Sequence, residues 1–152
     1  MQTIKRIVNP VEFHKVIDDL NNTFKEDEYL NTGLLKYNAE SIKRNFNNNK
    51  LLNWDLFVWA NFNGENYDAM ICFLNEKNVF FNEQIFSQHL WLSKNKKIGY
   101  KLFSTAIKFA KEKDFKYVKC KTCIDNIQEK KVKSFYEKIG LLKQSETYIC
   151  KL

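Results

Sequence analysis

The stretch KNKKIG, Lys94–Gly99, opens a strongly periodic helical pattern, and the stretch FYEKIG, Phe135–Gly140, closes a second one further along the chain. A basic loop that runs into a helix start suits phosphate binding, because the first N–H groups of a helix lack partners within it and lie at its positive end. Gly99 lets the backbone come close to such a group. From these two stretches the other elements are assigned outward.

Apolar residues repeat at helical spacing after the first stretch: Ile98, Leu102, Phe103, Ala106, Ile107 and Ala110. A strand at 115–124 separates this helix from a second helix at 128–139, which Gly140 closes. Two short strands within 141–152, the second of them Tyr148–Leu152, complete the chain. This order predicts a strand–helix–strand unit in the C-terminal third.

The first two thirds of the chain supply the remaining elements. A strand at 4–8 precedes a helix that begins at Asn9-Pro10, where the asparagine is a cap and the proline takes the first helical position. The inner face of this helix is predicted to be Phe13, Val16, Ile17, Leu20 and Phe24. There follow a polar loop at 25–36, a helix at about 38–47 with Ile42 and Phe46 inward, strands at 56–62, 67–75 and 79–92, and a turn at 63–66.

The complete order predicts an α/β fold with a mixed, mostly antiparallel central sheet of about seven strands and four helices on both faces. At 152 residues the chain is long enough for one sizeable core, so a single domain over 1–152 is expected. A hydrophobic content of 44% argues against disorder.

The formal net charge of +7 comes from lysines that are spread along the chain and interrupted by acidic residues. This distribution favours a solvated basic surface over a nucleic-acid interface. No apolar core follows the charges at the N-terminus, and no apolar run reaches the length of a membrane span, so a cytoplasmic protein is expected.

The four cysteines, Cys72, Cys120, Cys123 and Cys150, are predicted to be reduced. Cys120 and Cys123 have the spacing of a metal-binding pair, but they fall in a predicted strand, where alternation sends them to opposite faces. No second pair and no suitably spaced histidines complete a zinc site, so no metal is expected.

These elements and motifs resemble the GNAT superfamily of N-acetyltransferases, across nearly the whole chain in element order and over about residues 88–152 in motifs. The most specific match is FYEKIGL, Phe135–Leu141, which resembles the family's Phe-Tyr-Glu-Lys-x-Gly-Phe segment. Leu90-Trp91-Leu92 resembles the family's fourth strand, and Lys94–Gly99 stands in the place of its pyrophosphate loop. Only one of that loop's two glycines remains here.

The resemblance implies transfer of an acetyl group from acetyl-CoA to a primary amine of a small molecule or protein. Tyr136 lies in the family's place for the general acid, and a tyrosine with a pKa of about 10 can protonate the leaving thiolate at neutral pH. His89 and Glu83, on or near the fourth strand, are candidates for the base that deprotonates the amine. The residues expected to contact acetyl-CoA are Leu90, Trp91, Leu92, Lys94, Lys97, Ile98, Gly99, Tyr100, Lys101 and Asn126.

Strand alternation predicts that His89 shares a face with Trp91, opposite Leu90 and Leu92. Structural roles remain open for both candidate residues, since Tyr136 can be a packing aromatic and His89 a satisfied histidine. The acidic group Glu26-Asp27-Glu28 either attracts a cationic acceptor or is a solvated loop.

Two other functions remain open beside the transferase. One is a GNAT-like binding module that has lost catalysis and uses its positive surface for a protein or nucleic-acid partner. The other is an enzyme that modifies a nucleobase amine. No motif identifies the acceptor or the oligomeric state.

Overall fold

The computed structural model describes residues 2–24, 38–46, 48–53, 55–78, 83–120 and 127–141. Within them, five strands form one sheet in the order β1-β2-β3-β4-β5. These strands are β1 (Thr3–Ile7), β2 (Leu56–Phe62), β3 (Tyr67–Asn78), β4 (Glu83–Ser93) and β5 (Tyr117–Lys119). Neighbours from β1 to β4 are antiparallel, and β5 is parallel to β4. The predicted class, a mixed and mostly antiparallel α/β sheet, is confirmed.

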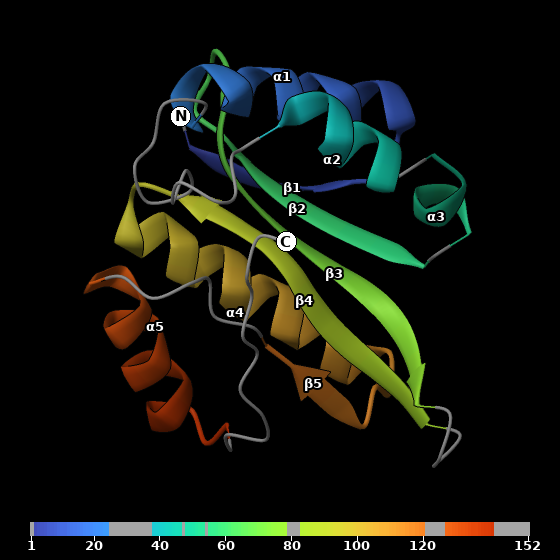
Figure 1. Ribbon diagram of the computed structural model, residues 1–152, viewed down its shortest axis with the longest axis vertical. Coiled ribbons are helices and arrows are strands. Elements are labelled where there is room, and N and C mark those ends of the chain that lie inside the picture. Colours follow the sequence, from blue (N-terminus) through green and yellow to red (C-terminus); the bar gives the residue numbers. More distant parts are fainter. Residues whose placement is uncertain are drawn as a thin grey trace, which may run out of the picture.

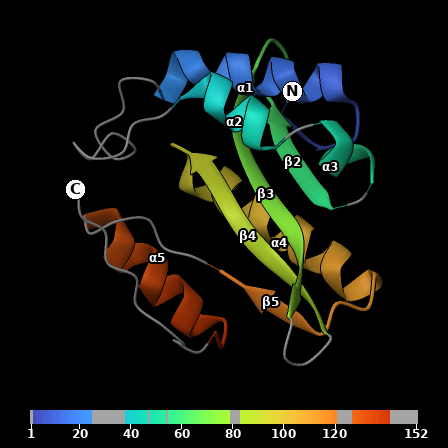
Figure 2. The same cartoon turned by 45° about the vertical axis from the view of Figure 1, so that its right-hand side comes forward.

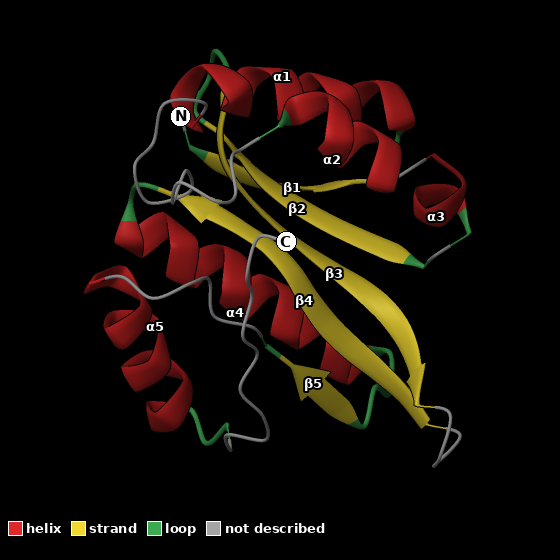
Figure 3. Cartoon of the chain, in the orientation of Figure 1, coloured by secondary structure: helices red, strands yellow, loops and turns green. Residues whose placement is uncertain are grey.

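Five described helices accompany this sheet: α1 (Pro10–Phe24), α2 (Ala39–Asn45), α3 (Asn48–Leu52), α4 (Lys96–Glu112) and α5 (Ile127–Lys138). Helices α1 and α2 lie together on one side of the sheet, and α4 crosses the other side (Figures 1 and 3). Helix α3, which is five residues long, was not predicted. The two strands predicted within 141–152 lie outside the described residues.

The face under α1 holds the first core. All five predicted inner residues of α1 are buried there, together with Val58, Met70 and Leu92 from the strands. Asn9 caps α1, because its Oδ1 accepts hydrogen bonds from the N–H groups of Val11 at 2.8 Å and Glu12 at 3.4 Å. Ile42 and Phe46 are half-buried and contact this core, as predicted.

None of the described helices is long and apolar enough to cross a membrane.

The opposite face holds a second, aromatic core under α4. Phe73 and Phe86 stack at its centre with ring centroids 4.1 Å apart. The apolar stripe of α4 is buried here except for Ile107, which is half-buried. Helix α5 ends at Lys138, and Gly140 closes the turn after it with a φ of +85°, the left-handed conformation that glycine adopts at helix ends.

Strand β4 has an unusual edge. The short β5 pairs only with Ile85, Phe86 and Ser87, so from Gln88 to Ser93 the outer edge of β4 has no partner among the described strands (Figure 2). Of the predicted strand at 115–124, residues 117–119 are strand and residues 115, 116 and 120 are not, while 121–124 lie outside the described residues. On its other side, β4 pairs with β3 through a bulge. Cys72 faces Leu90 and Phe73 faces Gln88, which leaves His89 as the extra residue.

Candidate functional site

The N-terminus of α4 continues directly from the open edge of β4. Asn95 caps this helix, and its Oδ1 accepts from the N–H groups of Lys97 at 3.0 Å and Ile98 at 3.2 Å. The N–H of Gly99 donates to the carbonyl oxygen of Asn95 at 2.9 Å, as the first bond within the helix. The expectation that the first N–H groups of this helix lack partners within it holds for Lys97 and Ile98, but not from Gly99 onward. The first two are capped by a side chain, and those from Gly99 onward lie inside the helix ladder.

The first turns of α4 carry a concentrated positive charge. Lys94 precedes the helix, Lys96 and Lys97 begin it, and Lys101 follows one turn later, with no acidic residue in the first turn. Lys97 and Lys101 are exposed. The ammonium of Lys94 lies 5.5 Å from the ring centroid of Phe24, which brings the end of α1 beside this loop. The charge and the helix dipole attract an anion to the same place.

Gly99 has a packing role that differs from the predicted one. It is buried, and a Cβ added to it would lie 3.4 Å from both Cβ of Ser93 and Nε1 of Trp91. The missing side chain therefore lets α4 approach the end of β4. Ser93 also fixes the connecting loop, because its Oγ donates to the carbonyl oxygen of Asn95 at 2.7 Å.

The side chains of the predicted strand motif belong to the two cores. Leu92 is buried and Leu90 half-buried against the first core. Trp91 lies on the other face, with its ring 5.4 Å from Phe103 and 6.5 Å from Tyr136 between centroids. Tyr100 stacks on Phe135 at 4.7 Å. What this segment presents to a ligand is the backbone along the open edge, whose N–H and C=O groups can pair with an extended molecule.

Tyr136 brings α5 to the point where that open edge begins. It is only 8% exposed, and its hydroxyl donates to Oε1 of Gln88 at 3.3 Å. The same hydroxyl interacts with the thiol of Cys120, which follows β5, and burial raises the pKa of that thiol to about 12. Tyr136 thus lies where β5 separates from β4 and where the bulge in β4 occurs.

His89 approaches the same point from the opposite face. Its Nε2 lies 2.7 Å from Oε1 of Glu76 on β3. Glu76 is two residues from Leu74 on the same strand, and so lies on the face of the sheet where Leu74 contacts the first core. The predicted placement of His89 on the face of Trp91 is therefore wrong. The extra residue at the bulge breaks strand alternation and turns His89 toward Glu76.

The structure does not bring together every predicted site residue. Glu83 is exposed at the other end of β4, five residues and about 17 Å from Gln88. Asn126, Cys123, Cys150 and the acidic group Glu26-Asp27-Glu28 lie outside the described residues. The sequence analysis missed Asn95, Gln88 and Glu76. The run Ser87-Gln88-His89, three polar residues inside an apolar strand, was the available signal for the bulge.

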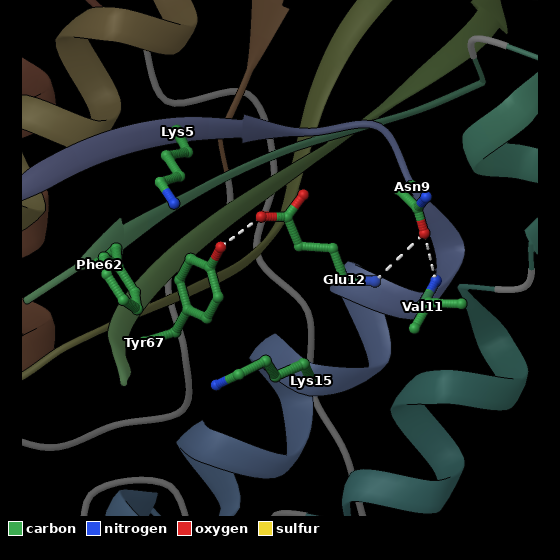
Figure 4. Close-up of a pocket in the computed structure, with 7 residues that line it drawn as sticks. All are labelled: Lys5, Asn9, Val11, Glu12, Lys15, Phe62 and Tyr67. Carbon is green, nitrogen blue, oxygen red and sulfur yellow. Dashed lines mark hydrogen bonds between the residues drawn. The ribbon is translucent and has the colours of Figure 1, made fainter. Parts of the chain in front are cut away.

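A surface cavity of about 450 Å³ lies at the other edge of the sheet, between β1, α1 and the β2–β3 hairpin (Figure 4). Its lining includes Lys5, Lys15 and Phe62, while Tyr67 donates from its hydroxyl to Glu12 across it. Because β2 and β3 separate it from β4, this cavity is not part of the site described above. Among the described residues, no group of three His, Cys, Asp or Glu side chains is arranged to hold a metal ion.

The fold matches solved structures closely, although the sequences differ. A predicted acetyltransferase from Clostridium acetobutylicum, solved with acetyl-CoA, has a TM-score of 0.70 at 14% identity, over 99% of this chain and 96% of that one. An aminoglycoside acetyltransferase from an uncultured soil metagenomic sample has a TM-score of 0.69 at 8% identity, over 100% and 99%. A transcriptional regulator from Bacillus halodurans C-125 has a TM-score of 0.70 at 18% identity, over 100% of both. The sequence matches no protein-family model and no curated protein.

Proposed function

We propose that this chain, which has the fold of the GNAT-type acetyltransferases, moves an acetyl group from acetyl-CoA to a primary amine of a small molecule or protein. One observation carries the proposal. The basic start of α4, the open edge of β4 and the hydroxyl of Tyr136 follow one another along a single line. Acetyl-CoA fits this order of groups. It has a polyphosphate at one end, amides along its arm and a thioester at the other end.

The phosphates would lie at the N–H groups of Lys97 and Ile98. These donors are available to a ligand once the side chain of Asn95 rotates away, because Asn95 holds them through one amide oxygen. Lys94, Lys96 and Lys101 supply further attraction for the negative charge. The amides of the arm would pair with the backbone of β4 beyond Gln88.

The reacting groups would meet at the bulge. Tyr136 reaches Gln88 from the side of α5, and His89 lies beside Gln88 on the side of α1. Tyr136 would protonate the leaving thiolate, and His89 would take a proton from the acceptor amine. Nothing supports Glu83 as the base, since it lies at the far end of the strand.

A titration of acetyl-CoA into the purified protein tests this proposal, and two substitutions at Asn95 make the test specific. Asn95→Asp keeps a good helix cap but places a carboxylate against the phosphates. Asn95→Gly retains most of the cap stability and removes the competing oxygen. We expect Asn95→Asp to weaken binding by about tenfold or more, equivalent to about 1.4 kcal/mol, and Asn95→Gly to bind at least as tightly as wild type.

Both Asn95 variants should unfold at temperatures close to that of the wild type, which calorimetry can verify. A wild-type protein that does not bind acetyl-CoA would contradict the proposal. Binding that is the same in Asn95→Asp and Asn95→Gly would place the phosphates elsewhere on the surface. If acetyl-CoA binds as expected, mass spectrometry of reactions with aminoglycosides, polyamines and peptide N-termini would identify the acceptor class.

The second candidate is a binding module with this fold and without catalysis. The side-chain cap on Lys97 and Ile98 favours it, because the N–H groups are already satisfied. A solved structure with this fold is described as a transcriptional regulator. A protein that binds acetyl-CoA and acetylates an amine excludes the second candidate.

A further inference from the structure

Three titratable side chains from three neighbouring strands meet on the face of the sheet that carries α1. Nε2 of His89 on β4 lies 2.7 Å from Oε1 of Glu76 on β3. The other carboxylate oxygen of Glu76, Oε2, lies 3.1 Å from Nζ of Lys119 on β5. Glu76 thus has one partner on each oxygen and connects the outer strand to the histidine.

The arrangement is accessible to a ligand. The side chains of His89, Glu76 and Lys119 are 23%, 30% and 49% exposed. No described helix covers this part of the sheet, since α1 and α2 lie toward its other end (Figures 1 and 2). His89 also follows Gln88, the partner of Tyr136, so the cluster borders the open edge of β4.

We propose that Glu76 and Lys119 are positioning residues that prepare His89 to act as the base, an inference that rests on the proposed function. The carboxylate of Glu76 accepts the Nε2–H of His89, which leaves Nδ1 as the acceptor of the neutral ring. Lys119 holds the second oxygen and so fixes the carboxylate. The bulge in β4 is what gives His89 this partner.

The charge state of Glu76 agrees with this role. Burial alone would raise the pKa of Glu76, but the hydrogen bonds from His89 and Lys119 outweigh it and the net shift is downward. The carboxylate is therefore ionised at neutral pH and can stabilise an imidazolium. Among the described residues, the charged groups of this cluster are Glu76 from β3 and Lys119 from β5, while Tyr136 and Cys120 lie toward the opposite face of β4.

Each proton released in the acetyl transfer passes to a named group or to water. The acceptor ammonium gives one proton to Nδ1 of His89, and the free amine forms the C–N bond as the C–S bond of the thioester breaks. The thiolate takes a proton from Tyr136, and the nitrogen releases its second proton to water. Solvent then reprotonates Tyr136 and removes the proton from His89, which restores both groups.

A double-mutant cycle on kcat separates positioning from a structural role. Glu76→Met removes the acceptor, and we expect kcat to fall by about tenfold or more, up to the about 10²–10⁴-fold that the general base itself contributes. Glu76→Gln keeps an oxygen acceptor and should retain more activity. In a His89→Gln background, Glu76→Met should have no further effect. Glu112→Met, which breaks an exposed ion pair on α4, is the matched control and should leave kcat unchanged.

A nitrogen NMR measurement gives a second readout that does not need activity. The chain has two histidines, so a His14→Gln background isolates the ring of His89. We expect its neutral form to carry the proton on Nε2 in the wild type and to become a mixture of tautomers in Glu76→Met.

Two results would overturn the positioning role. One is a loss of kcat from Glu76→Met that persists in the His89→Gln background. The other is a neutral His89 with its proton on Nδ1 while Glu76 is intact. A wild-type protein that does not bind acetyl-CoA contradicts the proposed function instead, and the tautomer then still decides whether Glu76 holds the ring.

Discussion

Single side chains decide how the end of β4 can be used. Tyr136 is buried on α5, and its hydroxyl reaches Gln88 at 3.3 Å, at the position where β4 loses its partner strand. Its ring meanwhile lies against Trp91, 6.5 Å away between centroids. Packing and chemistry are therefore carried by different parts of one residue, and a substitution can separate them.

Tyr136→Phe keeps the ring and removes the hydroxyl. If the hydroxyl protonates the leaving thiolate, kcat should fall by about 10²–10⁴-fold while the affinity for acetyl-CoA changes little. Tyr117→Phe is a suitable control, because Tyr117 is an exposed tyrosine of β5 that is not among the expected site residues. Steady-state kinetics beside a binding titration make the comparison. Equal turnover in Tyr136→Phe and wild type would remove Tyr136 from the mechanism.

At this scale the sequence predicted residues that sit in recognisable local motifs. Asn9 was predicted as a cap because proline follows it, and its side chain caps α1. Asn95 caps α4 in the same way, but this cap was not predicted. Glu76 could not be predicted, because its contact with His89 joins two strands across a bulge that only the paired sheet defines.

At the scale of elements, the junction of β4 and α4 controls the candidate donor site. Two residues separate the strand from the helix, and the helix then turns back over the second core. Gly99 makes this possible, since a Cβ there would lie 3.4 Å from Trp91 and Ser93. A side chain larger than a single carbon at this position would press on Ser93 and Trp91.

Gly99→Val should therefore act by displacing the start of α4 from β4. A branched side chain there needs more space than the single carbon that already fits tightly. We expect weaker acetyl-CoA binding together with a loss of stability of about 1–3 kcal/mol. Gly99→Ala should have a smaller effect of the same kind. Chemical denaturation and calorimetric titration of both variants measure the two quantities, and a fully stable Gly99→Val protein with unchanged binding would refute this account.

Element boundaries show what periodicity can and cannot predict. The strand Leu56–Phe62 and its following turn have the predicted limits, since a run of aromatic and branched residues and the Asn63-Gly64 turn signal mark them. Strand β5 takes up only 117–119 of the described part of the predicted strand at 115–124. An apolar stretch shows that residues are buried, but the pairing partner decides how many of them form a strand.

At the scale of the whole molecule, the sheet separates two cores that differ in composition. The first is mostly aliphatic and is closed by α1, while the second is rich in phenylalanine and is closed by α4. Element order alone predicted this layered arrangement, because amphipathic helices must bury their apolar faces against a sheet. It could not predict where the strands separate, which depends on contacts between elements far apart in the chain.

The first layer is joined to the sheet by a polar contact as well as by its apolar core. Tyr67 begins β3, is 3% exposed and donates from its hydroxyl to Glu12 of α1 (Figure 4). Its N–H donates to Asp19 at 3.0 Å. Burial, reinforced by the carboxylate of Glu12, raises the pKa of Tyr67 well above its ordinary value. The protonated phenol therefore stabilises the fold, and ionisation opposes it.

The sign of the pH dependence follows from this shift. Below the ordinary tyrosine pKa of about 10 the phenol is protonated in both folded and unfolded chains, so the stabilisation is complete. Above it, the unfolded chain releases a proton that the folded protein keeps, and the contribution is lost as pH rises. Tyr67→Phe should lower the free energy of unfolding by about 1–3 kcal/mol at pH 8, and the difference from wild type should narrow above about pH 10. Urea denaturation at pH 8 and pH 11 measures this, with the exposed Tyr117→Phe as control. A difference between wild type and Tyr67→Phe that stays constant across this range would show that ionisation of the phenol is not linked to folding, and no difference at pH 8 would show that Tyr67 contributes only through its ring.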